Sequence, residues 1–208
     1  MDMQLAAEVT AFSGKRWIAS GALGDVARAA KAHLDRGDSA GLLVFDDTTG
    51  EVVEVDFRGT LADVAARTGA GTEAPSPAAA GNATSLEPEP AQRGRGRPRL
   101  GVIAREVTLL PRHWDWLGSQ PGGASVVLRK LVETAKRANE GRDALRRSQE
   151  AVYRFALAMA GNEPGFEEAV RALYAADEAG FASLVTRWPP DIARHVGRLA
   201  QGCFGSAA

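Results

Sequence analysis

The sequence predicts an α+β fold with three successive segments. Short apolar runs, some of them alternating, fill residues 4–69 and are typical of a small antiparallel α/β unit. Residues 70–99 are rich in Ala, Pro, Gly and Arg and offer almost nothing to bury, which is typical of a flexible linker. Residues 100–204 contain one short strand candidate followed by helical periodicity, so this region is expected to be mostly α-helical.

Two short strands and a helix are expected first. "EVTAFSG" at residues 8–14 and "RWIASG" at residues 16–21 are rich in β-favouring side chains and meet at a turn, Ser13-Gly14. In "ALGDVARAAKAHLDRG", residues 22–37, apolar residues recur every three or four positions before a closing glycine. This spacing predicts a helix.

A hairpin is expected next, over residues 40–59, with "DDTTG" as its turn. Its first arm is a continuous apolar run, and its second arm alternates, with Val53, Val55 and Phe57 on one face. A short helix over residues 60–68 completes the unit. The order of two strands, a helix and two more strands predicts an antiparallel sheet with a helix packed on one face.

The C-terminal segment begins with a β-favouring stretch, "VTLL", which a proline ends. A short helix over residues 111–120 follows, with Trp114 and Leu117 on its apolar face. After the break at "PGG", a long helix is expected from an N-cap at Ser125 as far as Ala160. Three amphipathic helices are then expected in "GFEEAVRALYAAD", "EAGFASLVTRW" and "PPDIARHVGRLAQG".

Positive charge is concentrated in the middle of the chain. The formal net charge is −1, but residues 93–147 hold 13 basic and 5 acidic side chains. Residues 71–92, just before them, hold 3 acidic and no basic side chains. Such a concentration predicts a local site for a polyanion, with a solvated basic face as the alternative.

One strand and two helices in residues 105–137 enclose little core, and a lone strand leaves its hydrogen-bonding edges open. Pairing with the same strand of a second copy remedies both. The stretches "VTLLP" and "SVVLRKLV" resemble the ribbon-helix-helix family of bacterial DNA-binding proteins. The resemblance implies a homodimer with an intermolecular two-stranded ribbon and double-stranded DNA as its partner. It also implies DNA-backbone contacts from the start of the second helix, at Gly123, Ala124 and Ser125.

The same resemblance implies that alternate side chains of the strand enter the major groove, either the odd-numbered or the even-numbered set. The family pattern of apolar residues inward favours Thr108 outward, with Val107 and Leu109 inward. Glu106 then faces the groove too, where it can only accept from a cytosine amino group. Together with Arg105 at the start of the strand, Glu106 and Thr108 are the candidates for major-groove contact.

A basic stretch, "QRGRGRPRLG", lies just before this segment. Its centre matches the core of the AT-hook, a short motif that binds the minor groove of AT-rich DNA, at Arg95, Gly96, Arg97 and Pro98. Glycine lets the backbone lie deep in the narrow groove while both arginines extend along its floor. Arg93 and Arg99 supply flanking charge for the DNA backbone. A solvated linker and an RNA-binding Arg-Gly segment are the alternatives.

No catalytic residue, cofactor site or metal site is predicted. His33, His113 and His195 are far apart in the sequence, and no Gly-Lys-Ser/Thr follows a glycine-rich turn. The pair Asp46 and Asp47 is interpreted as turn-forming rather than as cation-binding. A single cysteine, no run of about 18 apolar residues and no secretory signal predict a cytoplasmic protein without a membrane segment.

Over most of its length the chain also resembles a bacterial family known as domain of unknown function 2239. The matching blocks are "GRPRLGV", "REVTLLPRHWDWL" and "GGASVVLRKLVE". That family implies no activity. The sequence therefore supports the hypothesis of a dimeric, non-enzymatic DNA-binding protein of the nucleoid, either a transcriptional regulator or a nucleoid-associated protein. A protein–protein interaction module of the antitoxin kind and an RNA-binding protein are the alternatives.

Overall fold

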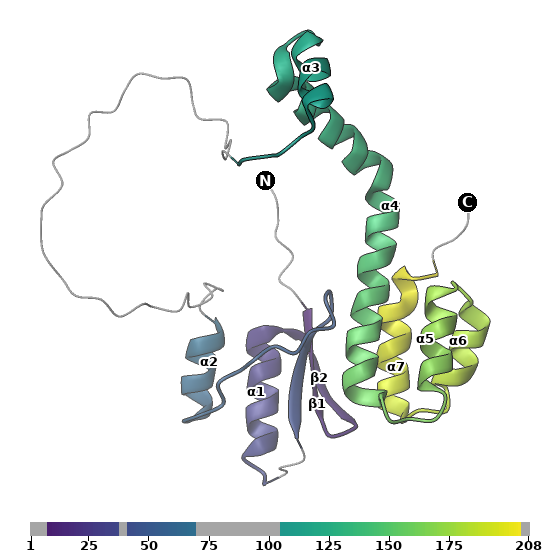
Figure 1. The fold of residues 1–208 in the computed structure, drawn as a ribbon. Helices are drawn as coiled ribbons and strands as arrows, with labels where there is room; N and C mark the ends of the chain where they lie inside the picture. The colour runs from purple at the N-terminus through teal and green to yellow at the C-terminus, as the bar shows by residue number, and fades with distance from the viewer. Residues whose placement is uncertain (1–7, 38–40, 70–104, 205–208) are drawn as a thin grey trace, which may run out of the picture. The chain divides into compact units, whose positions relative to one another are not determined.

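The computed structural model describes residues 8–37, 41–69 and 105–204 (Figure 1). The chain divides into two compact units, one formed by residues 1–72 with residues 138–208, and the other by residues 73–137. The predicted α+β class is confirmed, because a small antiparallel sheet comes first and the C-terminal region is mostly helical. No helix in these described ranges is long and apolar enough to cross a membrane.

The N-terminal residues form a three-stranded antiparallel sheet in the order β2-β1-β3. The predicted hairpin is present as β1 (Glu8–Ser13) and β2 (Arg16–Ala22), with Gly14 in the left-handed region at the turn, φ 54°. The third strand, β3 (Leu42–Asp46), pairs with the other edge of β1. The central strand of the sheet is therefore β1.

The expected fourth strand is not formed. After the turn, an isolated bridge joins Phe45 to Val52, and the Val53 N–H donates to the Val44 carbonyl at 2.7 Å. Val53, Val55 and Phe57 are nonetheless partly buried on one side, against the cluster that contains Val44. The alternation of these residues thus reflects burial of one face of an extended chain. Such burial does not require a β-ladder of hydrogen bonds.

One face of the sheet packs against α1 (Leu23–Leu34), whose buried side includes Val26 and Ala30. These two side chains form a small core with apolar residues of β1 and β3, Val9, Ala11 and Val44. The predicted short helix is α2 (Leu61–Gly69), and Val64 is its buried residue. The helix-on-sheet arrangement expected for this part is confirmed.

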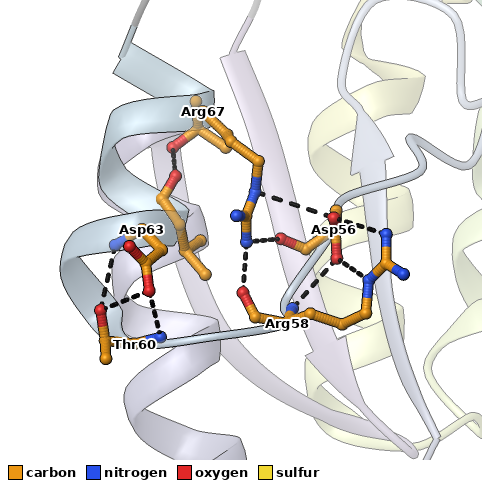
Figure 2. A network of polar contacts seen from close by, with 7 residues as sticks. Asp56, Arg58, Thr60, Asp63 and Arg67 are labelled. Atoms are coloured by element: carbon orange, nitrogen blue, oxygen red, sulfur yellow. Dashed lines mark hydrogen bonds and ion pairs between the residues drawn. The ribbon is translucent and has the colours of Figure 1, made fainter.

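A polar network fixes the start and the end of α2 (Figure 2). The Asp63 carboxylate accepts from the Thr60 N–H at 2.8 Å, and Thr60 Oγ1 accepts from the Asp63 N–H at 3.3 Å, which is a reciprocal capping box. Arg67 donates to the Asp56 carbonyl at 3.0 Å and to the Arg58 carbonyl. Hydrogen bonds from Arg58 hold the pKa of Asp56 well below its ordinary value. These contacts hold residues 56–58 against α2. This stretch therefore leaves the sheet at the place where the fourth strand was expected.

The opposite face of the sheet is covered by the C-terminal helices. Phe12 and Phe45 are fully buried there against the second half of α4 (Gly123–Ala160). The same core includes residues of α5 (Phe166–Tyr174), α6 (Glu178–Val185) and α7 (Pro190–Leu199). Figure 1 shows these helices beside the sheet. This grouping differs from the expected separation of residues 4–69 from residues 100–204. Its physical reason is that the two phenylalanines are buried by the C-terminal helices and not by another element of the described N-terminal residues.

The turn "DDTTG" is pressed directly onto α4. Gly50 has a left-handed backbone, φ +68°, and a Cβ placed on it would lie 2.1 Å from the carbonyl oxygen of Ala151. Arg154 of α4 donates to the Thr49 carbonyl of the same turn at 3.2 Å. Only glycine combines a left-handed backbone with the absence of a Cβ atom. Gly50 therefore sets how closely the turn can approach α4.

Candidate functional site

The segment predicted to bind DNA contains the two expected helices. The first, α3 (Pro111–Ser119), begins at its proline, and Gly122 and Gly123, at the junction with α4, adopt positive φ angles of 92° and 76°. Residues 105–110 carry no regular secondary structure, so the predicted strand has no partner within the described residues. A ribbon built from two copies of the chain remains a prediction, because a single chain contains only one of its strands.

The residues predicted to contact the major groove are all exposed, namely Arg105, Glu106 and Thr108. Their neighbour Leu109 is partly buried and lines an apolar cavity of about 260 Å³ between α3 and α4. Successive side chains of an extended chain point to opposite faces, which places Thr108 on the face away from this cavity. Val107, two positions before Leu109, is 55% exposed, so burial in the single chain does not separate the odd-numbered set from the even-numbered one.

The start of α4 differs from the expected cap. The helix begins at Gly123, so Ser125 lies in its first turn and is not the N-cap. The Gly123 N–H already donates to the Gln120 carbonyl at 3.2 Å, which removes it from the N–H groups expected to face a phosphate. Of the three predicted backbone contacts, those of Ala124 and Ser125 remain. The AT-hook-like stretch, Arg93 with Arg95, Gly96, Arg97, Pro98 and Arg99, lies outside the described residues.

Large apolar side chains are exposed on this segment. Leu117 is buried, but Trp114, which the spacing predicts to be buried beside it, is 43% exposed. The cavity lined by Leu109 is open to solvent, and its other lining residues are side chains of α3 and α4: His113, Trp116, Leu117, Leu128 and Leu131. Further exposed apolar residues are Val107, Leu110, Val126 and Val132. The short helix α3 and the first half of α4 leave these side chains exposed in the single chain.

Basic side chains are exposed and unpaired from residue 105 to residue 147, a range that we call the basic segment. It contains nine lysines and arginines, and none forms an ion pair with a described residue: Arg105, Arg112, Arg129, Lys130, Lys136, Arg137, Arg142, Arg146 and Arg147. Elsewhere in the described residues, nine of twelve are paired with a carboxylate, at Lys15, Arg28, Lys31, Arg58, Arg67, Arg154, Arg171, Arg194 and Arg198. The excess positive charge seen in the sequence is thus left free for an outside partner.

A second polar cluster lies in the other unit, where the sequence predicts no site. Arg198 of α7 donates to the Asp47 carboxylate at 2.7 Å and to Thr10 Oγ1 at 2.9 Å. The Thr10 hydroxyl in turn donates to Asp47 at 3.0 Å. Asp46 behaves as predicted, since its Oδ1 accepts from the N–H groups of Thr48 and Thr49. Asp47 instead points inward and ties the turn to α7.

His195 completes this cluster as a neutral side chain. Burial lowers the pKa of His195 to about 4, and the charge of Arg198 acts in the same direction. A guanidinium can only donate, so the 2.9 Å contact from Arg198 makes Nδ1 an acceptor and leaves the ring proton on Nε2. Nε2 lies 3.5 Å from Asp47 Oδ1, and neither atom has a hydrogen-bond partner. The only lone pair of the imidazole is therefore occupied, and His195 cannot act as a base in this state.

The pKa of Asp47, the acid in this cluster, is also shifted. Burial raises the pKa of Asp47, against the Thr10 hydrogen bond and the charge of Arg198, which both lower it. The three ionisable groups come from positions 47, 195 and 198, so no local motif could have indicated their contact. The only signal was the position of His195 and Arg198 on one side of a helix.

No group of three or more His, Cys, Asp or Glu side chains in the described ranges is placed to hold a metal ion. Comparison with known proteins gives one family. The family model described as an uncharacterized protein conserved in bacteria, DUF2239, matches residues 8–200, and the chain belongs to this family. No curated protein and no solved structure matches the chain.

Proposed function

We propose that the chain is a homodimeric DNA-binding protein, either a transcription regulator or a nucleoid-associated protein, that uses the basic segment of both copies. The proposal rests above all on the nine unpaired basic side chains of that segment. An exposed cation without a carboxylate partner can neutralise a phosphate and release its counterions without first losing an ion pair. The proposal assigns binding, and no catalysis, to the chain.

A second copy supplies what the segment lacks. Antiparallel pairing of residues 105–110 between two copies satisfies the backbone groups that have no ladder partner in one chain. The apolar residues beside that stretch, including Trp114 and Trp116, are exposed in the single chain and available to be covered by the partner copy. The apolar surface that is exposed in the single chain is thus the surface that we propose to be buried in the dimer.

The paired strands then form the element that reads DNA. A two-stranded ribbon fits the major groove, and we assign Leu109, which lines the apolar cavity, to its inner face and Thr108 and Glu106 to its outer face. Arg105 begins the strand and is exposed. The first free N–H groups of α4, at Ala124 and Ser125, are suited to a phosphate.

The salt dependence of binding to a short random duplex tests this proposal. In Arg129→Gln with Lys130→Gln, the slope of log affinity against log salt should flatten by about 0.9 for every phosphate that the variant no longer neutralises. The matched control is Arg28→Gln with Arg171→Gln, which removes two exposed charges that are already paired. The control should keep the wild-type slope. If the salt slope flattens equally in both variants, binding depends on the total charge of the protein and not on a site in the basic segment.

The AT-hook-like stretch extends the proposal to the minor groove. Replacing Arg95 and Arg97 with alanine should weaken binding to AT-rich DNA more than to GC-rich DNA. Replacing Arg93 and Arg99 should reduce the salt slope with little change in AT preference, because phosphates carry no sequence information. Equal loss on both duplexes in the first variant contradicts minor-groove insertion. Binding to RNA as tight as to AT-rich DNA contradicts the choice of DNA.

A further inference from the structure

We propose that a cavity in the sheet-containing unit binds a small aromatic carboxylate. The cavity has a volume of about 330 Å³ and is lined by residues of β2 and α7: Trp17, Ser20, Asp191, Arg194, His195 and Arg198. Its volume is at the lower end of the range for ligand sites, which suits one ring and its acid group. The inference does not depend on DNA binding, since all of these residues lie outside the basic segment.

Two guanidinium groups with unused donors line the cavity. Arg194 and Arg198 lie one helical turn apart on α7 and therefore on the same side of it. Arg194 donates to Asp191 through Nη1 at 2.9 Å, and Arg198 makes its contacts to Asp47, Thr10 and His195 through Nη2. The other nitrogens of each guanidinium have no partner among the described residues. Each arginine is thus held in place by one carboxylate and still offers N–H groups to an anion.

The position of the aromatic wall is fixed by hydrogen bonds. The indole Nε1 of Trp17 donates to Ser20 Oγ at 2.8 Å, and the main-chain N–H of Trp17 donates to Asp191 Oδ2 at 3.1 Å. The single proton of the Thr10 hydroxyl goes to Asp47, so Ser20 must donate to Thr10 across their 2.8 Å contact. The indole is therefore oriented by a chain of bonds that reaches the buried cluster, yet it remains exposed beside the cavity. A fixed, exposed aromatic face is suited to stacking on a planar ring.

The unused donors of the site favour an anion over a cation. His195 is buried and has no hydrogen-bond partner at Nε2, and it contributes no positive charge in its neutral form. The two guanidinium charges are balanced by the carboxylates of Asp191 and Asp47, so it is the N–H groups without a partner that attract an anion. Asp47 lies behind Arg198, where it is largely buried. A carboxylate that accepts from Arg194 and Arg198 while its ring stacks on Trp17 uses the unpaired guanidinium donors and the exposed indole face.

The test is NMR titration of the full-length chain with benzoate, followed at the indole N–H of Trp17, which the spectrum of Trp17→Phe assigns. We expect a saturable shift with a Kd of about 1 mM or tighter, as the size of benzoate allows. Benzyl alcohol, which lacks the charge, and cyclohexanecarboxylate, which lacks the aromatic ring, should each bind at least about tenfold more weakly. The absence of a saturable benzoate shift overturns the proposal, as does equal binding of either analogue.

A pair of matched variants locates the site. Arg194→Gln should weaken benzoate about tenfold by removing charge-assisted hydrogen bonds. Arg171→Gln is its control, because Arg171 is 71% exposed and Arg194 73%, and each pairs with an acid three positions earlier. Both changes are at the surface, and equal thermal unfolding of the two variants confirms that both fold. The same loss of binding in both variants overturns the proposal.

Discussion

The basic side chains have opposite environments in the two parts of this molecule, and so do three of the tryptophans. In the core shared by the sheet and the C-terminal helices, Trp188 is buried, and Arg198 is bonded to a carboxylate. In the basic segment, Trp114 and Trp116 are exposed, and Arg129 has no acidic partner among the described residues. Outside the basic segment, most of the described basic side chains are paired with a carboxylate. The second part leaves apolar surface and positive charge for other molecules, and this difference is why we assign binding of a second copy and of DNA to it.

We call the sheet and the C-terminal helices that cover it the packed part. The contrast predicts that even a small substitution at a tight contact in the packed part destabilises the protein. Gly50→Ala should destabilise the protein by about 3–5 kcal/mol, because the new Cβ collides with α4 and the left-handed backbone is strained as well. Gly37→Ala is the matched control, since Gly37 also has a positive φ, +89°, but nothing lies near its Cβ position. Its cost should be about 1–2 kcal/mol, from the backbone alone. Urea unfolding compares the two, and equal costs would show that the turn does not press on α4.

The buried histidine should make the packed part sensitive to mild acid. His195 has a folded-state pKa of about 4 against an ordinary value of 6.5, so the unfolded state binds the extra proton first. Stability should fall as the pH drops from about 6.5 to about 4, by as much as about 3 kcal/mol, and this contribution should not change further below that. Asp47, whose pKa is raised, acts in the opposite sense at the acid end of this window.

Urea unfolding of His195→Gln across the same pH range checks this prediction. The variant lacks the titrating ring, and its loss of stability between pH 6.5 and 4 should be smaller than that of the wild type. If wild type and variant lose stability in parallel over the range, other groups are responsible.

The basic segment should respond to an apolar-to-charged change through association and not through stability. Leu131→Asp should weaken dimerisation by at least about tenfold, because burying a leucine is worth roughly 1.5–3 kcal/mol. Leu157→Asp is the control on the same helix, since Leu157 is 50% exposed and Leu131 48%. Light scattering over a dilution series should show dissociation only in Leu131→Asp. Dissociation of both variants, or of neither, removes the distinction between the two parts of α4.

The smallest effect is expected at the exposed network of α2. Thr60→Ala removes the cap that Asp63 and Thr60 share and should cost about 1 kcal/mol, measured as a lower midpoint of urea unfolding. DNA affinity should not change, because this network lies outside the basic segment. A change in DNA affinity without a change in stability would place α2 at the interface.

The sequence was sufficient for the helices and for the first three strands. Their apolar spacing and their glycine and proline boundaries are local signals, and α3, α5 and α7 lie where those signals place them. The fourth strand was predicted wrongly, since the alternation at Val53, Val55 and Phe57 reflects one-sided burial and the Asp56–Arg67 contacts carry the chain elsewhere. The alternation in a sequence indicates that one face of a stretch is buried. It does not indicate whether the backbone of that stretch pairs with another strand.

Contacts between distant parts of the chain could not be predicted. Residues 4–69 were expected to form a separate unit, and nothing local showed that helical residues after position 138 cover Phe12 and Phe45. Asp47 was interpreted with Asp46 as turn-forming, and only the fold brings it to Arg198. The exposure of Trp114 was equally hidden, because helical spacing indicates an apolar face but not whether the same chain covers it.

The central claim is that pairing of residues 105–110 between two copies creates the DNA-binding form. The most direct measurement is light scattering and duplex affinity on the same samples of Thr108→Pro and Thr108→Ala. Proline removes the N–H that a ladder needs, whereas alanine keeps it. We predict a monomer of 21.9 kDa that has lost most of its DNA affinity for Thr108→Pro, and a dimer that still binds the duplex for Thr108→Ala. A Thr108→Pro protein that remains dimeric and binds DNA as tightly as the alanine variant would contradict the account.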